Sequence, residues 1–219
     1  MILGIHNGVR HQSIMQVDCI TVHDLEQAME VSLAQIQRSL LTFLQHRTDV
    51  VLFGAYAVNA YLEPQDVRMT ADIDLQATDG EQLVRAICDH LHQEFYIAPR
   101  SRRLKNHPAW RIYQVLKSGN RHLVDVRQVE VLPASERINN IQVLSPIALM
   151  QSKVISAYAR QNQPKGFSDL RDLYSLMLRF PELGEQVTVD PSNPALTAFW
   201  RSIQSQNIQA PEEDEDLLY

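Results

Sequence analysis

The segment that decides the fold prediction spans residues 71–77, which are Ala71-Asp72-Ile73-Asp74-Leu75-Gln76-Ala77. Apolar and polar residues alternate strictly along it, which predicts a β-strand with one buried face. Asp72 and Asp74 then share the polar face, about 7 Å apart at Cα because a strand rises about 3.3 Å per residue. Two carboxylates so close repel each other unless a cation lies between them. A hard divalent cation such as Mg²⁺ binds carboxylate oxygens, so the pair predicts a metal site.

A second predicted strand offers a third carboxylate. In residues 123–127, Val124 and Val126 form an apolar face and Asp125 lies on the opposite one. If this strand neighbours the first, the three acids form one cluster that two Mg²⁺ ions can share. The alternative is that these acids are solvated residues of an exposed strand face.

The segment before the first strand favours the metal-site interpretation. Residues 50–53 are apolar and end at Gly54, which predicts a buried strand, a tight turn and a helix from Ala55 to Leu62. The amides of such a turn can hold a triphosphate. Gly54 permits the close backbone approach that this needs.

Further outward, other elements follow from periodicity and from turn residues. The sequence predicts an amphipathic helix over 21–46, a helix capped by Asp79 and an extended stretch that starts with residues 95–97. It also predicts a hairpin of strands 110–117 and 121–129, a strand at 141–143, and helices over 146–160, 167–180 and 194–208. The predicted fold class is α+β (α/β-like), a mixed β-sheet flanked by helices with a C-terminal helical lobe. The expected domains are an N-terminal extension (1–20), a core (21–143), the helical lobe (144–208) and a disordered acidic tail (209–219).

Charge is distributed unevenly along the 219 residues. The net charge is −6, but five acids lie at 212–216, so the rest of the chain carries only −1. The stretch from Phe95 to Val124 has no Asp or Glu, yet it holds seven Lys or Arg residues, with His107, Trp110 and Tyr113 among them. This pattern predicts either a phosphate-binding patch for RNA or a triphosphate, or a solvated hairpin whose cations protect a sheet edge.

Several classes of protein are disfavoured. No apolar run approaches the roughly 20 residues of a membrane-spanning helix, and no secretion signal is expected at the N-terminus. Two cysteines, Cys19 and Cys88, predict a reduced, cytoplasmic protein. The phosphate-loop, Rossmann and nucleophile-elbow motifs are absent from the sequence.

Spaced motifs over about residues 48–178 give the sequence a family resemblance. Arg68-Met69-Thr70-Ala71-Asp72-Ile73-Asp74 matches a pattern Arg-x-Thr-x-Asp-Ile-Asp, and Gly54-Ala55-Tyr56-Ala57 matches Gly-Gly-x-Ala with Ala55 in place of the second Gly. The C-terminal half adds Ser145-Pro146, Lys153, Arg160, Lys165, Asp169, Asp172 and Leu173. In this order the motifs resemble the nucleotidyltransferase superfamily typified by DNA polymerase beta, above all its bacterial branch of abortive-infection type IV toxin transferases.

The resemblance implies an activity: Mg²⁺-dependent transfer of an NMP from an NTP to a hydroxyl of RNA such as tRNA, of a protein or of a small molecule. A toxin that pairs with an antitoxin is implied by the resemblance alone. It also implies roles for particular residues. Asp72, Asp74 and Asp125 would bind the metal, and Asp125 would also help to deprotonate the hydroxyl. Gly54 and Ala55 would line the phosphate site. Arg68 and Thr70 would position the loop or the nucleotide, and Lys153 with Asp169 would face the nucleotide.

Some alternatives remain open at this point. Ala55 motivates a catalytically weak nucleotide-binding or partner-binding protein on the same fold. Arg68 either contacts phosphate or forms a salt bridge with a carboxylate of the site. Lys153 either faces the nucleotide or lies on a solvated helix face. The predicted helix over 21–46 would also suit a dimerisation module.

Overall fold

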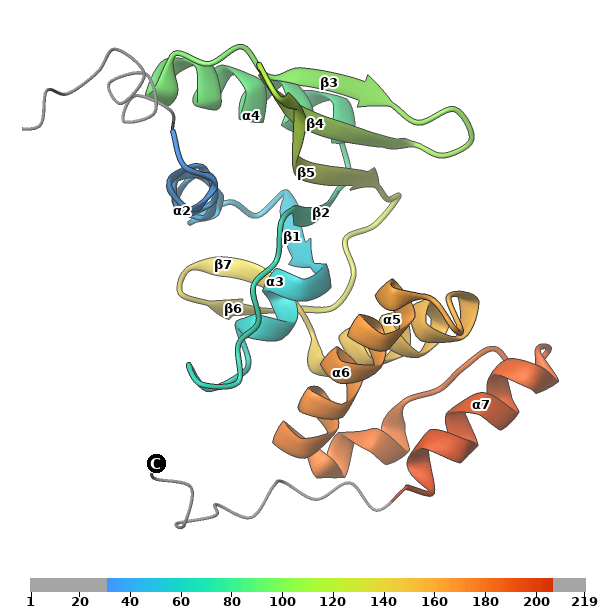
Figure 1. Cartoon of the computed structure of the whole chain (residues 1–219). Helices are drawn as coiled ribbons and strands as arrows, with labels where there is room; N and C mark the ends of the chain where they lie inside the picture. The colour runs from blue at the N-terminus through green and yellow to red at the C-terminus, as the bar shows by residue number, and fades with distance from the viewer. Residues whose placement is uncertain (1–30, 207–219) are drawn as a thin grey trace, which may run out of the picture. The chain divides into compact units, whose positions relative to one another are not determined.

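A mixed seven-stranded sheet is the centre of the fold in the computed structural model, which describes residues 31–206 (Figure 1). The order across the sheet is β3-β4-β5-β2-β1-β7-β6. The strands are β1 (Val50–Phe53), β2 (Ile73–Ala77), β3 (Arg100–Arg103), β4 (Ala109–Leu116), β5 (Gly119–Gln128), β6 (Ser135–Ile138) and β7 (Ile141–Leu144). All of them belong to the unit that begins at Leu33.

Strand β2 lies in the middle of the sheet and follows the predicted alternation. Ile73, Leu75 and Ala77 are at most 1% exposed, which confirms that they form the buried face. β2 pairs with β1 in the antiparallel sense and with β5 in the parallel sense. Two strands far apart in the sequence therefore lie side by side.

Helices cover the sheet and form the C-terminal lobe. They are α2 (Leu33–Leu44), α3 (Gly54–Asn59), α4 (Gly80–Phe95), α5 (Pro146–Ala159), α6 (Pro164–Arg179) and α7 (Pro194–Gln204), with a 3-10 helix at Pro181–Gln186. α4 packs on β2–β5, whereas α5 contacts α6, α7 and α3 (Figure 1). This arrangement confirms the predicted fold class. The predicted domain boundaries stay predictions.

The helix starts agree with the capping signals of the sequence. The Asp79 side chain accepts a hydrogen bond from the Gln82 amide at the start of α4. Pro146 is at the first position of α5, where its missing N–H costs no hydrogen bond. No helix within residues 31–206 has the length and apolar character needed to cross a membrane.

Two predicted elements need correction, and two strands were missed. The stretch at 95–97 is not extended, because Phe95 completes the amphipathic helix α4 and Tyr96 caps it with a φ of 54°. The edge strands β3 and β6 were not predicted, since neither alternates in burial. A continuous helix over 21–46 is wrong: Val31 and Ser32 precede α2 without helical structure, and residues 21–30 lie outside the described part, as do 207–208 of the last predicted helix.

Candidate active site

The turn after β1 brings the backbone against an acidic side chain. Gly54 begins α3 with a φ of +72°, a conformation that favours glycine. A β-carbon at this position would lie 2.7 Å from Cγ and 2.9 Å from Cβ of Asp74. Gly54 is therefore required here for two reasons, its backbone conformation and the space that the Asp74 carboxylate occupies.

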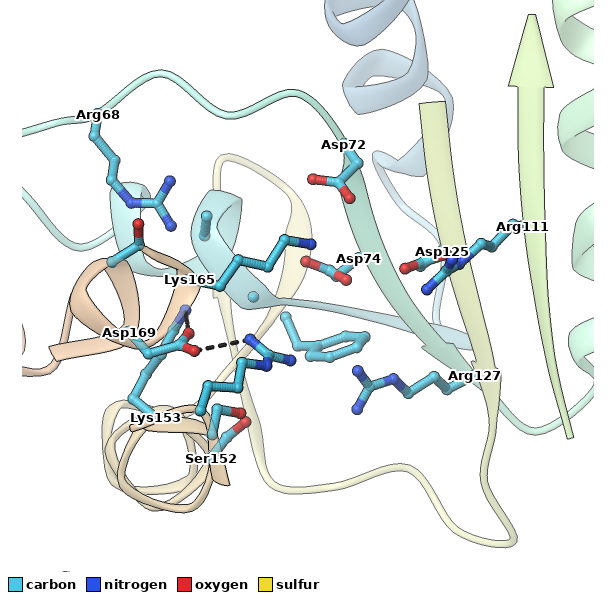
Figure 2. A pocket seen from close by; sticks show the side chains of 16 residues that line it. Arg68, Asp72, Asp74, Arg111, Asp125, Arg127, Ser152, Lys153, Lys165 and Asp169 are labelled. Carbon is cyan, nitrogen blue, oxygen red and sulfur yellow. Dashed lines mark hydrogen bonds and ion pairs between the residues drawn. The ribbon is translucent and has the colours of Figure 1, made fainter. Parts of the chain in front are cut away.

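The three predicted acids meet at one end of the central strands. Asp74 on β2 is directly opposite Asp125 on β5, and Asp72 lies two residues before Asp74. All three line one cavity of about 280 Å³ (Figure 2). We call Asp72, Asp74 and Asp125 the acidic cluster. The condition set by the sequence, that the two strands must be neighbours, is met.

Asp74 is the member of the acidic cluster whose negative charge its surroundings disfavour. Burial, followed by the charges of Asp72 and Asp125, raises the pKa of Asp74 to about 6. The pKa of Asp72 is lowered instead, chiefly by its hydrogen bond with His122. A cation at this point would relieve the repulsion at Asp74, so the donor set fits a divalent metal ion.

His122 is a site residue that the sequence analysis missed. Its Nδ1 lies 3.1 Å from Asp72 Oδ2 and its Nε2 lies 3.0 Å from Asp125 Oδ1. These two hydrogen bonds, the one with Asp125 first, raise the pKa of His122 to about 9. Asp72, His122 and Asp125 each offer one ligand atom, and these three atoms lie within 4.8 Å of one another. Such a group could hold a metal ion.

A β-bulge explains why the sequence pattern did not show this histidine. Residues three apart on a regular strand point to opposite faces, so His122 should face away from Asp125. The register of β4 and β5 shifts here: Ile112 pairs with Val124, but Tyr113 pairs with His122. The extra residue, Leu123, brings His122 to the face of Asp125.

Two arginines border the acidic cluster from the sheet. Arg111 on β4 is opposite Asp125, and its Nε donates to Asp125 Oδ1 at 3.1 Å. Arg127, two residues after Asp125, lies over the Phe53 ring at 4.7 Å from its centroid. Both arginines line the cavity, so it has cationic as well as anionic walls.

The opposite wall comes from the helical lobe and contains a buried series of ion pairs. Lys153 Nζ on α5 donates to Asp169 Oδ1 at 3.1 Å and to Asp172 Oδ2 at 2.5 Å, both on α6. Arg160 donates to Asp169 Oδ2 at 2.8 Å. Arg68 donates to both oxygens of Asp172, at 2.6 and 2.8 Å. We call these five residues the ionic chain.

The ion pairs of the ionic chain show which of the two alternatives holds for Lys153 and which holds for Arg68. Lys153 is 6% exposed, so a solvated helix face is wrong for this residue. Arg68 forms the salt bridge with a carboxylate rather than extending free into the cavity, and the carboxylate is Asp172 of the lobe. Burial alone would raise the pKa of Asp172, but the hydrogen bonds from Arg68 and the charge of Lys153 outweigh it, so this pKa is lowered.

The remaining predicted residues hold the loop or line the cavity. Thr70 is outside the cavity lining, and its backbone oxygen accepts a hydrogen bond from Gln37 Nε2 at 3.1 Å, which fixes the loop before β2. Ala55 is buried and lines the cavity. Lys165, near the start of α6, reaches toward Asp72 and Asp74 (Figure 2), and its charge contributes to the lowered pKa of Asp72.

The residues of the basic stretch 95–124 differ in how exposed they are. The arginines of β3 are exposed on an edge strand. Trp110 is only 7% exposed and packs against Gly80, so it is not available to stack on a base. The structure thus corrects the interpretation of Trp110, and an RNA-binding role for the exposed arginines stays a prediction.

Comparisons with known proteins identify the fold. No protein-family model and no curated protein sequence matches this chain. Among solved structures, the Megavirus polyadenylate synthase matches with a TM-score of 0.57 at 13% identity, over 80% of this chain and 41% of that protein. JHP933 from Helicobacter pylori matches at 13% identity over 78% and 90% of the two chains, with a TM-score of 0.48. The nucleotidyltransferase toxin MenT4 from Mycobacterium tuberculosis matches at 15% identity over 83% and 63%, with a TM-score of 0.43.

The chain shares its fold with the Megavirus polyadenylate synthase, in agreement with the fold class that the sequence predicted. Membership of the nucleotidyltransferase superfamily stays a prediction of the sequence motifs. The described chain spans about two fifths of the length of the viral polyadenylate synthase. At this level of identity the likeness concerns the fold, and the activity of this chain has to be argued from its own residues.

Proposed function

We propose that this protein is a divalent-metal-dependent nucleotidyltransferase that moves an NMP from an NTP to a hydroxyl acceptor. The observation that carries the proposal is the acidic cluster beside the Gly54 turn, in a cavity whose other walls hold Arg111, Arg127 and Lys165. Carboxylates that converge opposite cationic groups provide both the metal ligands and the phosphate contacts that this transfer needs.

Asp72, Asp74 and Asp125 would hold Mg²⁺, with room in the donor set for two ions. The raised pKa of Asp74, which comes from burial first and from the charges of Asp72 and Asp125 second, supports this assignment. Bound there, Mg²⁺ would supply charge neutralisation for the phosphates and for the oxygens that attack and leave.

The NTP phosphates would lie between the Gly54–Ala55 turn and the lobe. Gly54 and Ala55 line the cavity from one side, and Lys165 and Arg160 line it from the other. Lys153 and Asp169 also line the cavity but are hydrogen-bonded to each other. We therefore assign to this pair the positioning of the wall that carries Arg160 and Lys165.

In the proposed reaction, the acceptor hydroxyl oxygen bonds to the α-phosphorus and the bond from that phosphorus to the β-phosphate oxygen breaks. Pyrophosphate leaves with the electron pair of that bond. The hydroxyl proton passes to Asp125, which lies beside Asp74 at the cavity wall. RNA such as tRNA, a protein and a small molecule remain the candidate acceptors, and a toxin role with an antitoxin partner stays a prediction of the family resemblance.

The test is transfer of label from α-labelled NTPs. Purified full-length protein with Mg²⁺ and a lysate rich in tRNA should yield labelled product, which Asp72→Ala should abolish. Asp66→Ala is the matched control, because Asp66 is exposed and outside the cavity. Equal labelling by Asp72→Ala and wild type would refute the proposal. Nucleotide binding in calorimetry without transfer to any acceptor would favour the catalytically weak alternative that Ala55 motivates.

A further inference from the structure

We propose that His122 provides a ring nitrogen to the divalent ion of the acidic cluster, so that the site combines nitrogen and oxygen ligands and prefers Mn²⁺ over Mg²⁺. This inference rests on the proposed function and makes it more specific. It concerns a residue outside the predicted set of three aspartates.

The backbone of β5 is built to direct this side chain to the site. Without the bulge at Leu123, His122 would lie on the face of the sheet opposite Asp125. Both Leu123 and Val124 are buried, at 1% and 0% exposed, which is the burial pattern of a strand that changes face at this point. Bulges are frequent beside active sites, where they redirect one side chain.

The imidazole ring is also held in a defined orientation. Tyr113, its cross-strand partner, lies against it with ring centroids 5.3 Å apart and an interplanar angle of 37°. Asp72 and Asp125 lie at the two ring nitrogens, at 3.1 and 3.0 Å. A ring fixed on three sides cannot easily turn away when an ion binds to Asp72.

The two nitrogens have different surroundings, which assigns their roles. Nε2 faces Asp125 Oδ1, and the same oxygen accepts a hydrogen bond from Arg111, so both bonds belong to one network. Asp72 and Asp125 are both proposed metal ligands, but Nδ1 faces Asp72 outside that network, so Nδ1 is the nitrogen that would bind the ion and release its proton to solvent. Metal-binding histidines usually donate their second N–H to a carboxylate, which is the arrangement that Nε2 and Asp125 already form.

A ring nitrogen among the ligands changes which ion the site favours. Mg²⁺ prefers an octahedral set of oxygens, whereas imidazole suits transition-metal ions. The alternative is that His122 only holds the two carboxylates in place and never contacts the ion. The two accounts differ in one observable, the presence of nitrogen bound to the metal.

Pulsed electron paramagnetic resonance of Mn²⁺ bound to the full-length protein measures this directly. We expect ¹⁴N coupling in wild type and its loss in His122→Gln, with no change in His107→Gln, whose histidine is exposed and outside the cluster. Calorimetry with each metal alone should show the preference for Mn²⁺ over Mg²⁺ falling about tenfold in His122→Gln.

The outcomes separate this inference from the proposed function. Mn²⁺ that binds tightly to wild type without ¹⁴N coupling, or coupling that persists in His122→Gln, overturns the inference and leaves the metal site standing. Mn²⁺ binding that is absent, or unaffected by Asp74→Asn, overturns both. The wild-type spectrum alone is decisive should His122→Gln fail to fold.

Discussion

Two groups of charged residues meet at one cavity, which the acidic cluster and all of the ionic chain except Asp172 line, and the two groups differ in how their charges are balanced. In the ionic chain, two aspartates face three cations, and each carboxylate has at least two cationic hydrogen-bond partners. In the acidic cluster, Asp74 is partly buried beside two further carboxylates. The pKa values follow this difference, since that of Asp172 is lowered and that of Asp74 is raised to about 6.

The comparison separates the charges that stabilise the fold from those that a bound ligand would compensate. A buried group that is fully paired contributes to the native structure, and removing one partner leaves a buried charge uncompensated. A buried group surrounded by like charge destabilises the metal-free protein and gains its compensation from a ligand. The predictions that follow test this distinction.

The largest effect on stability is expected in the ionic chain. Lys153→Met leaves Asp169 and Asp172 buried without their shared cation, although each keeps an arginine. We expect a loss of about 3–5 kcal/mol in the free energy of unfolding, measured by urea denaturation. The control is Arg85→Met, which breaks an exposed pair with Glu81 and should cost under about 0.5 kcal/mol. Equal losses in both variants would contradict a special role for the buried chain.

Gly54→Ala should have the next largest effect, because it forces a β-carbon against Asp74. The left-handed conformation costs about 1 kcal/mol and the steric conflict about 2 kcal/mol, so we expect about 3 kcal/mol in all. Repeating Gly54→Ala in an Asp74→Ala background isolates the steric part, because that background removes the carboxylate that the added β-carbon would meet. Equal losses in the two backgrounds, measured by urea denaturation, would show that contact with the Asp74 carboxylate has no cost.

The sequence predicted the acidic cluster because alternation along a strand is a local property. Ile73 and Leu75 define the buried face of β2, so the orientation of Asp72 and Asp74 follows without knowledge of the neighbours. Asp125 required one further condition, the parallel pairing of β2 with β5, and the structure fulfils it. The hydrophobic pattern was therefore enough to predict the common face of Asp72 and Asp74, whereas the place of Asp125 beside them depended on the strand pairing.

Other features depend on tertiary structure and could not be predicted. His122 lies in the site only because the register shifts between β4 and β5. The sequence of residues 119–128 contains no local pattern that predicts this bulge. The burial of Lys153 depends on how α5 packs on α6, since its two acidic partners are 16 and 19 residues away. Trp110 looked like a surface aromatic among arginines, yet its partner Gly80 belongs to α4, a separate element.

The smallest of these effects should have the opposite sign. Asp74→Asn removes a charge that the metal-free fold disfavours, so it should stabilise the chelator-treated protein by about 2 kcal/mol at pH 7.5 while abolishing transfer. Lys153→Met in the ionic chain should instead lower stability, by about 3–5 kcal/mol. Denaturant unfolding with excess chelator measures both, and Asp66→Asn, at an exposed position, should change stability by less than about 0.5 kcal/mol.

The pH dependence of this stabilisation follows from the pKa of Asp74. Because the folded-state pKa is about 6 and the ordinary value is 3.8, the folded protein binds this proton more tightly than the unfolded chain does. The contribution of the Asp74 carboxyl to the free energy of unfolding of the wild type therefore falls as the pH rises from about 4 to about 6, and it is constant above that range. The advantage of Asp74→Asn should accordingly be near zero at pH 4 and complete by about pH 7. A stabilisation that is already complete at pH 4 would show that it does not come from the charge of Asp74. A variant less stable than wild type at pH 7.5 would show that this carboxylate is compensated within the fold, as that of Asp172 is.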